Sequence, residues 1–284
     1  MERVGFVGLG MMGRPMAMNM VAKGCPLTSL DAAGVTLEGA EAAADAAALA
    51  RECRLIILML PDSRAVDAVM SALLPVLSAG SLVIDMGSSE PAETRRWAEA
   101  LAGRGCAMLD APVSGSVPKA RGGNLAIMVG GADADFARAE PLLRMMGEAI
   151  IRTGEVGSAH AMKALNNYVY AAGLLAVSEA AQLAEAQGLD LGIFAAVLNA
   201  SSGRNIASET KLAQEITSRR YAGGFQLGLM RKDLETAGGI AAATGAEAPL
   251  LALLRARWSA ALSEFGPRAD NTEIHRFITA KAKV

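Results

Sequence analysis

The N-terminal apolar stretch VGFVGLGMMG, residues 4 to 13, is interrupted by three glycines. Each glycine weakens regular secondary structure, so three of them at the end of a predicted strand need a local reason. The spacing fits G-x-G-x-x-G where a strand hands over to a helix. There Gly8 allows the tight turn, Gly10 lets a pyrophosphate touch the backbone, and Gly13 lets helix and strand pack closely. We therefore predict that a dinucleotide contacts Gly8, Leu9, Gly10, Met11, Met12 and Gly13.

A carboxylate at the end of the second predicted strand indicates whether NAD or NADP would bind. Asp31 follows Gly13 by roughly the 20 residues that separate such a glycine motif from the acidic residue on the ribose hydroxyls. A negative charge in that place repels a 2′-phosphate, so NAD is favoured over NADP. The alternative is that the glycines only pack a turn, which Asp31 caps.

Composition limits the classes of protein to which this chain can belong. Its formal charge is −2, its pI is about 5.8 and no basic run stands out, so nucleic acid and anionic membranes are poor partners. No apolar run approaches the roughly 18 residues of a membrane span, and MERVGFVGLG is unlike a signal peptide. Cys25, Cys53 and Cys106 lie far apart, and no cluster has metal-ligand spacing. We expect a cytoplasmic protein without a metal.

Apolar runs alternate with helical patterns through the first half of the chain. This rhythm predicts a doubly wound, Rossmann-type α/β domain around a parallel sheet. The predicted strands are Arg3–Gly8, Leu27–Asp31, Leu55–Leu60, Leu82–Asp85, Cys106–Asp110 and Leu125–Gly131. The predicted helices are Met12–Lys23, Ser63–Leu74, Pro91–Ala102 and Asp133–Met146.

After Thr153 helical patterns follow one another without strand alternation. The first of them covers 160–187, and the others cover 190–199, 205–219, 226–244, 247–264 and 270–281. The sequence predicts an NAD-binding domain over residues 1–158 and an all-helical substrate and dimerisation domain over residues 159–284.

An amine and an amide share one face of the first long predicted helix. Lys163 and Asn167 are four residues apart in AMKALNNYVY, the spacing that places side chains one above the other. A lysine near a helix start is commonly a solvated surface charge, and that interpretation stays open. In the other, the first turn faces the cofactor and the lysine is a base. A lysine base needs a pKa lowered by roughly three units from about 10.4, through burial and a nearby positive charge.

The segment DAPVSGS, residues 110–116, ends a predicted strand in a Pro–Ser–Gly turn. Ser114, together with the backbone N–H groups of Gly115 and Ser116, could cradle a carboxylate. A plain β-turn explains the same residues equally well.

Taken together, these motifs resemble the β-hydroxyacid dehydrogenases, and among them the 3-hydroxyisobutyrate dehydrogenases, over nearly the whole chain. The resemblance includes GFVGLGMMGRPMAMNM, the Leu60–Pro61 pair, DMGSSEP at 85–91, DAPVSGS, GGNLAIMVGG, GSAHAMKALNN, LNASSGR at 198–204 and GGFQLGLMRKD at 223–233. Several such motifs in the same order are far more specific than a glycine motif alone.

The resemblance implies a role for each of several residues. Lys163 would be the catalytic acid/base, and the substrate would be held by Ser114, Gly115, Ser116 and Asn167. The cofactor would also be contacted by Leu60, Pro61, Ser88 and Lys232; without the resemblance, Lys232 is a surface charge beside Asp233.

Several positions depart from the family pattern. Ser116 replaces the second glycine of SGG, Lys119 stands where a small residue is common, and Gly87 replaces a serine. Ala159 replaces a glycine, and His160 takes a position usually filled by glutamine. These changes bear on the substrate, which could instead be serine, threonate or a sulfonated analogue.

The chain has two histidines. His160 is a candidate proton carrier, weighed against a solvent-facing or cofactor-phosphate role, and His275 is expected to be structural.

The hypothesis drawn from the sequence is an NAD-dependent oxidoreductase that oxidises a small 3-hydroxy carboxylate and forms a homodimer or homotetramer. One alternative is a reductase of tartronate, succinic or sulfonated semialdehyde working in the reverse direction. Another is a non-catalytic dinucleotide-binding protein.

Overall fold

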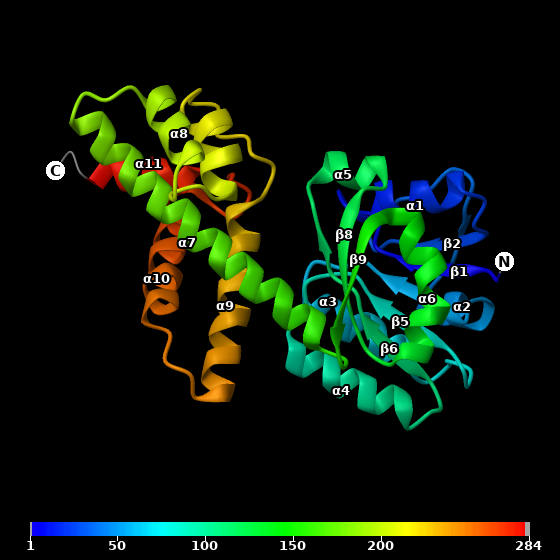
Figure 1. The fold of residues 1–284 in the computed structure, drawn as a ribbon. Coiled ribbons are helices and arrows are strands. Elements are labelled where there is room, and N and C mark those ends of the chain that lie inside the picture. Colours follow the sequence, from blue (N-terminus) through cyan, green and yellow to red (C-terminus); the bar gives the residue numbers. More distant parts are fainter. Residues whose placement is uncertain (1, 282–284) are drawn as a thin grey trace. The chain divides into compact units, whose positions relative to one another are not determined.

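The computed structural model describes residues 2–281 and divides into two compact units, Met1–Lys163 and Ala164–Val284. The first unit is an α/β domain and the second consists of helices (Figure 1). Helix α7 (Ser158–Ala186) begins in the first unit and continues into the second. The fold class is therefore the one that the sequence predicts.

The first unit is built around one sheet. Its strands are β1 (Val4–Val7), β2 (Leu27–Leu30), β3 (Glu41–Ala42), β4 (Leu55–Leu58), β5 (Leu82–Asp85), β6 (Ala107–Asp110), β7 (Val113–Ser114), β8 (Leu125–Gly130) and β9 (Gly147–Gly154). The order β3-β2-β1-β4-β5-β6 is parallel throughout. This is the strand order of a doubly wound dinucleotide-binding sheet. Strands β2 and β3 extend the sheet to one side of β1, and β4, β5 and β6 extend it to the other side.

Helices cover both faces of this sheet because successive strand residues point to opposite sides. They are α1 (Gly13–Ala22), α2 (Ala46–Glu52), α3 (Ser63–Leu73), α4 (Pro91–Ala102), α5 (Val117–Gly122) and α6 (Asp133–Met146). On one face Phe6 and Ile57 share a buried core with Met20 of α1 and with α6. On the other face the core combines Val7 and its neighbours with α2, α3 and α4. Figure 1 shows the α/β unit in this arrangement.

The sheet differs from the predicted one at its far end. Strand β8 runs antiparallel to β6 and to β7, and β9 then pairs parallel to β8. The sheet is therefore mixed, although the sequence predicts a parallel one. Antiparallel additions to a parallel sheet are common at its edge. The elements that the sequence did not predict are β3, β7, β9, α2 and α5.

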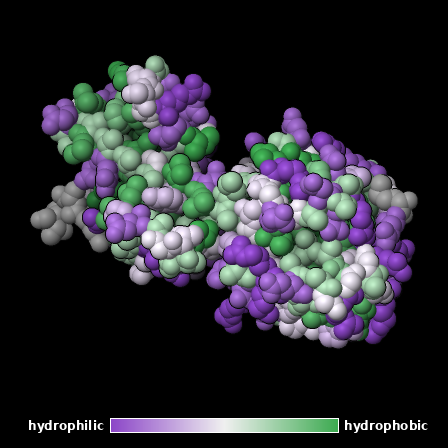
Figure 2. Space-filling view, turned by 60° about the horizontal axis from the view of Figure 1, so that its bottom comes forward, coloured by the Kyte–Doolittle hydropathy of each residue, from purple (hydrophilic) through white to green (hydrophobic). Residues whose placement is uncertain are grey.

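The second unit is helical. Besides most of α7 it contains α8 (Leu191–Ala200), the π-helix η1 (Ala207–Ile216), α9 (Leu227–Thr244), α10 (Pro249–Phe265) and α11 (Glu273–Lys281). Its core surrounds the fully buried Trp258. Hydrophobic side chains, green in Figure 2, also reach the surface of this unit. Six large ones in the described part of this unit are more than half exposed: Val169, Leu183, Leu189, Ile193, Val197 and Ile206.

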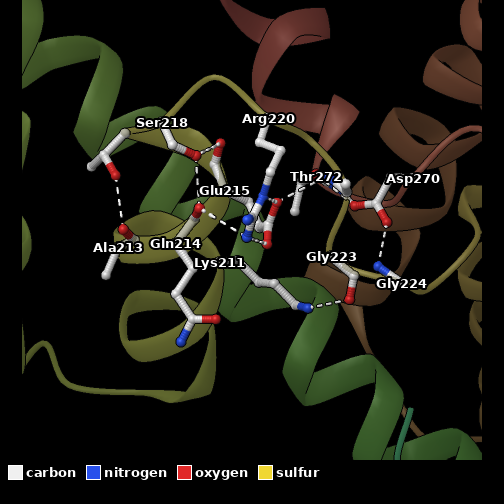
Figure 3. A network of polar contacts seen from close by, with 12 residues as sticks. Lys211, Ala213, Gln214, Glu215, Ser218, Arg220, Gly223, Gly224, Asp270 and Thr272 are labelled. Carbon is white, nitrogen blue, oxygen red and sulfur yellow. Dashed lines mark hydrogen bonds and ion pairs between the residues drawn. The ribbon is translucent and has the colours of Figure 1, made fainter. Parts of the chain in front are cut away.

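A polar network holds the loop between η1 and α9 (Figure 3). The buried carboxylate of Glu215 accepts two hydrogen bonds from Arg220, at 3.0 and 2.6 Å, and one from the Ala222 N–H. Asp270 accepts from the Gly224 N–H at 2.7 Å, and Lys211 donates to the Gly223 carbonyl oxygen at 2.8 Å. These bonds fix the chain just before α9.

Across residues 2–281, no helix is long and apolar enough to cross a lipid bilayer.

Candidate functional site

The glycine turn connects β1 to α1. Gly8 has a φ of 98°, and a Cβ there would lie 2.4 Å from the Met59 carbonyl oxygen. A Cβ at Gly13 would lie 2.0 Å from the Gly8 carbonyl oxygen. At Gly10, by contrast, a Cβ would meet nothing within 4 Å. The protein therefore requires glycine at positions 8 and 13 for its own packing, and the exposed backbone of Gly10 is open to a ligand.

Helix α1 presents its N-terminus at this turn. Its N-cap residue, Met12, makes no side-chain hydrogen bond, and the first turn contains no acidic residue. Such an end favours an anion because its backbone N–H groups and the helix dipole both attract negative charge. Exposed backbone at Gly10 and an N-terminus without an anion of its own together fit the pyrophosphate of a dinucleotide.

Asp31 is joined to the same turn. One carboxylate oxygen accepts from the Leu9 N–H at 2.7 Å, and the other accepts from the Ala33 N–H at 2.9 Å. The side chain follows β2, directly beside the end of β1. A carboxylate oxygen has two lone pairs, so each can accept a further hydrogen bond from a ribose hydroxyl.

The loops after β4 and β5 lie against each other. A Cβ at Gly87 would lie 2.7 Å from the Leu60 carbonyl oxygen, which explains why this position, where the resemblance implies a serine, holds glycine in this chain. The Glu90 N–H donates to the Ser63 hydroxyl at 2.8 Å and joins the two loops again. Leu60 and Pro61 therefore lie in the loop that packs on the loop of Ser88, at the carboxyl edge of the sheet where ligands of open α/β folds bind.

The segment after β6 forms a short strand and a helix where the sequence allowed a plain β-turn. Val113 and Ser114 form β7, and Ser114 pairs with Ala126 of β8. Gly115 has a φ of 142°, and a Cβ there would lie 3.2 Å from the side chain of Lys119. Ser114 is partly buried, whereas Gly115 and Ser116 are exposed. Lys119 thus passes close to the residues that the resemblance assigns to the substrate carboxylate.

The helical unit brings Asn167 and Lys232 together through a residue that sequence reasoning missed. The Asn167 amide nitrogen donates to Asp233 Oδ2 at 2.5 Å, and Lys232 Nζ lies 3.7 Å from Asp233 Oδ1. Asn167 and Asp233 are both buried. The sequence signal for Asp233 is only its place beside Lys232 in α9, and the partner lies 66 residues earlier.

Lys163 lies on α7 one turn before Asn167 and is partly buried. It is the last residue of the α/β unit.

His160 lies one turn before Lys163, and its position corrects one expectation. The residue is 1% exposed, so a solvent-facing role is wrong. Its ring lies among Thr94, Asp85 and Asp110, all of them buried. Neither carboxylate was a candidate from sequence, because each ends a strand that gives no sign of what packs against its end.

The described part of the chain contains no group of three or more histidine, cysteine or acidic side chains arranged to hold a metal ion.

Known proteins are similar to this chain over most of its length. Residues 3–154 match the model of the NAD binding domain of 6-phosphogluconate dehydrogenase, and residues 157–278 match that of the NAD-binding domain of NADP-dependent 3-hydroxyisobutyrate dehydrogenase. A 3-hydroxyisobutyrate dehydrogenase of Pseudomonas aeruginosa is 36% identical over 269 residues, covering 90% of both chains. The 2-(hydroxymethyl)glutarate dehydrogenase of Eubacterium barkeri is 35% identical over 240 residues, covering 82% of this chain and 80% of the relative.

A solved structure is similar as well. The Mycobacterium tuberculosis 3-hydroxyisobutyrate dehydrogenase with L-serine superposes with a TM-score of 0.92 at 30% identity. The match covers 98% of this chain and 99% of that one.

Proposed function

Because the chain belongs to the β-hydroxyacid dehydrogenase family, we propose that it is an NAD-dependent dehydrogenase of a small 3-hydroxy carboxylate. A substrate like 3-hydroxyisobutyrate would be oxidised to its semialdehyde or keto acid. The observation that carries this proposal is the spacing on α7 of an amine, Lys163, and an amide, Asn167, whose orientation is fixed by the buried Asp233.

The proposed mechanism assigns one task to each group. The nicotinamide ring, when bound, supplies the hydride acceptor. Lys163 takes the hydroxyl proton as its neutral amine, and in the reverse direction its ammonium returns that proton to the carbonyl oxygen. Asn167 orients the substrate oxygen, and Ser114 with the Gly115 N–H holds the carboxylate. Such positioning contributes to the rate alongside the proton transfer itself.

Two features support the binding of a dinucleotide, and one of them favours NAD over NADP. Gly10 exposes backbone at the start of α1, and Asp31 lies beside the same turn with acceptor capacity left over. The carboxylate disfavours the extra phosphate of NADP through like-charge repulsion.

Lys119 favours a second candidate substrate class. The aliphatic carbons of this exposed side chain pass beside Gly115, so its ammonium can reach the proposed carboxylate cradle. A hydroxy acid with a second anionic group, a carboxylate or a sulfonate, would gain from that charge. The corresponding semialdehyde reduction runs through the same residues in the opposite direction.

The test is a substrate panel combined with a lysine variant. The panel contains 3-hydroxyisobutyrate, serine, threonate, glycerate and sulfonated analogues, each with NAD and with NADP at alkaline pH. Lys163→Ala is expected to lower kcat by about 10² to 10⁴ while NADH binding stays normal. The matched control is Lys23→Ala, which removes a lysine that hydrogen-bonds the Met145 carbonyl oxygen at 2.8 Å in the α/β unit.

Three results would count against the proposal. Near-normal turnover in folded Lys163→Ala removes the mechanism. Binding of NADH without oxidation of any acid, or reduction of any semialdehyde, favours a non-catalytic dinucleotide-binding protein. A clear preference of the unmodified protein for NADP overturns the role given to Asp31.

A further inference from the structure

Two buried carboxylates lie side by side at the ends of neighbouring strands. Asp85 ends β5, Asp110 ends β6, and the two residues are paired in the register of the parallel sheet. Both are 0% exposed. Burying two negative charges together is costly unless hydrogen bonds and an opposite charge compensate them.

Backbone and hydroxyl donors supply part of this compensation. Asp110 accepts from the Gly157 N–H at 2.7 Å and from the His160 N–H at 2.9 Å, so it caps the first turn of α7. Asp85 accepts from the Gly87 N–H at 2.9 Å and from the Ser89 hydroxyl at 2.6 Å. Each carboxylate therefore acts purely as an acceptor toward these four donors.

The His160 ring lies between the carboxylates. Its Nε2 is 3.8 Å from Asp85 Oδ2, and its Nδ1 is 4.0 Å from Asp110 Oδ2 and 2.8 Å from the Thr94 hydroxyl. That hydroxyl donates to the Glu90 carbonyl oxygen at 3.1 Å, which leaves its oxygen to accept from Nδ1–H. Nε2 makes no hydrogen bond, and the nearest carboxylate oxygen to it belongs to Asp85. The ring is therefore held by its contact with the Thr94 hydroxyl and has a buried carboxylate beside each nitrogen.

Two cationic residues belong to the segments that pack here. The guanidinium of Arg95, an exposed residue of α4, lies beside Gly157. Lys163 is one helical turn further along α7. The carboxylates of Asp85 and Asp110 thus face His160 from the sheet, and Thr94 faces it from α4.

We propose that His160 is a positioning residue for the reaction: its buried ring, bonded to Thr94 and packed against Asp85 and Asp110, joins the ends of β5 and β6 to the first turn of α7. Asp85 begins the loop of Ser88, Asp110 begins the segment of Ser114, and α7 presents Lys163. The ring therefore sets how these three segments of the α/β unit lie relative to one another. Each segment carries a residue with a role in the function proposed above, so the inference rests on that proposal.

A glutamine in place of His160 has nearly the same length but lacks the ring. Its polar atoms sit on a single amide group, so it cannot bond Thr94 and also fill the space between the two carboxylates. His160→Gln thus tests the ring while it keeps a polar side chain at this position.

The first experiment follows the imidazole rings by NMR in protein labelled with ¹⁵N-histidine. The chain has two histidines, and His275→Gln assigns the spectrum. We expect the Nδ1 signal of His160 to be that of a nitrogen bonded to the Thr94 hydroxyl, and His275, whose pKa burial lowers, serves as the internal reference. In Thr94→Val, which removes that hydroxyl and keeps the ring, we expect a changed Nδ1 signal. An Nδ1 signal that Thr94→Val leaves unchanged overturns the proposal, because the ring would then make no bond to Thr94.

The second experiment measures the consequence. In His160→Gln we expect amide exchange of residues 158–163 to be at least tenfold faster, and kcat to be about 10- to 100-fold lower with the KM for NAD unchanged. His275→Gln should match the unmodified protein in both respects. Unchanged exchange and an unchanged pH profile of kcat in His160→Gln overturn the proposal. If the unmodified protein oxidises none of the acids, the proposed function fails, and the NMR and exchange measurements still decide whether His160 makes this link.

Discussion

At the scale of single residues, the orientation of Asn167 depends on a carboxylate from another helix. Asp233 accepts from the Asn167 amide nitrogen, so the amide oxygen is directed away from that contact and toward Asn166, whose side-chain nitrogen lies 3.2 Å from it. A hydrogen bond to a buried, charged acceptor is stronger than a neutral one. Asp233 therefore restrains a side chain that we assign to the substrate.

Removing the charge of Asp233 is expected to weaken this restraint. Asp233→Asn keeps an acceptor oxygen and the shape of the side chain but makes a neutral hydrogen bond. We expect kcat/KM for the hydroxy acid to fall about tenfold, the equivalent of about 1.4 kcal/mol. Asp233→Ala should lose more, because it leaves the buried Asn167 amide unpaired. An unchanged kcat/KM in Asp233→Asn would show that Asn167 needs no charged partner.

We expect the choice of cofactor to depend on a single residue as well. Asp31→Ser removes the negative charge beside the glycine turn and keeps a side chain that can accept a hydrogen bond. We expect the ratio of kcat/KM for NAD to that for NADP to fall by at least tenfold, because the repulsion of a 2′-phosphate is lost. Steady-state kinetics with both cofactors measure the ratio. An unaltered ratio in the variant would assign cofactor choice to another part of the loop after β2.

At the scale of elements, the sequence predicts the strands and helices that have a local pattern of apolar residues. It misses the elements that form only because residues far away in the sequence pair with them. The apolar runs that form buried strands, such as the one that contains Ile56 and Ile57, are visible in the sequence, and so are most of the helices between the strands. Strand β9 was missed because it follows α6 without a turn signal and contains the charged residues Glu148, which is exposed, and Arg152, which is partly buried. Its pairing with β8 is what makes it a strand.

The same limit applies to the candidate site. The glycine turn, Asp31, Lys163 and Asn167 stand in local motifs, so sequence reasoning can nominate them. The carboxylates around His160 come from residues 50 and more positions away, and helical periodicity shows only which face a residue occupies. For this reason the sequence could not distinguish an exposed His160 from a buried one.

The loop between η1 and α9 stores backbone strain that its polar contacts offset. Arg219 and Tyr221 have φ values of 57° and 50°, in the left-handed region that non-glycine residues rarely adopt. Arg220 stands between them and binds Glu215 through two nitrogens. The Arg220 guanidinium holds the pKa of Glu215 below its usual value, against the effect of burial.

This contact predicts an acid-sensitive contribution to stability. Because its pKa is lowered in the folded state, Glu215 stabilises the fold above its ordinary pKa, and the contribution is lost as the pH falls through the lower folded value. We expect Glu215→Gln to lower the free energy of unfolding at pH 7 by about 1 to 2 kcal/mol, a modest figure because Arg220 is largely exposed. Denaturant titrations between pH 7 and pH 3 measure it, and the difference should vanish at the acid end.

The control lies in the same helix. Glu209 pairs with the exposed Arg204, so Glu209→Gln should stay within about 0.5 kcal/mol of the unmodified protein at every pH. Equal effects of the two substitutions would show that burial of Glu215 does not matter.

At the scale of the whole molecule, the helical unit leaves apolar side chains uncovered. Ile193 and Val197 are 68% and 55% exposed and lie one turn apart on α8. Contiguous exposed apolar side chains mark surfaces at which proteins associate. We propose that a second copy of this chain covers them in a homodimer or homotetramer.

Light scattering at micromolar concentration tests this proposal. The unmodified protein is expected to have at least twice the mass of one chain, and Ile193→Glu combined with Val197→Glu should reduce that mass because two charges would be buried at the contact. Ala243→Glu, on an exposed position of α9, should leave the mass unchanged. A monomeric unmodified protein would contradict the proposal.

The chain's two histidines are divided between its two units, with His160 in the first and His275 in the second. Both rings are buried, each in contact with a hydroxyl, of Thr94 in one case and of Tyr221 in the other. Each unit thus carries its own intrinsic spectroscopic reporter. On heating, simultaneous loss of both native signals would mean that the chain melts cooperatively, whereas loss of one before the other would identify the half that gives way first.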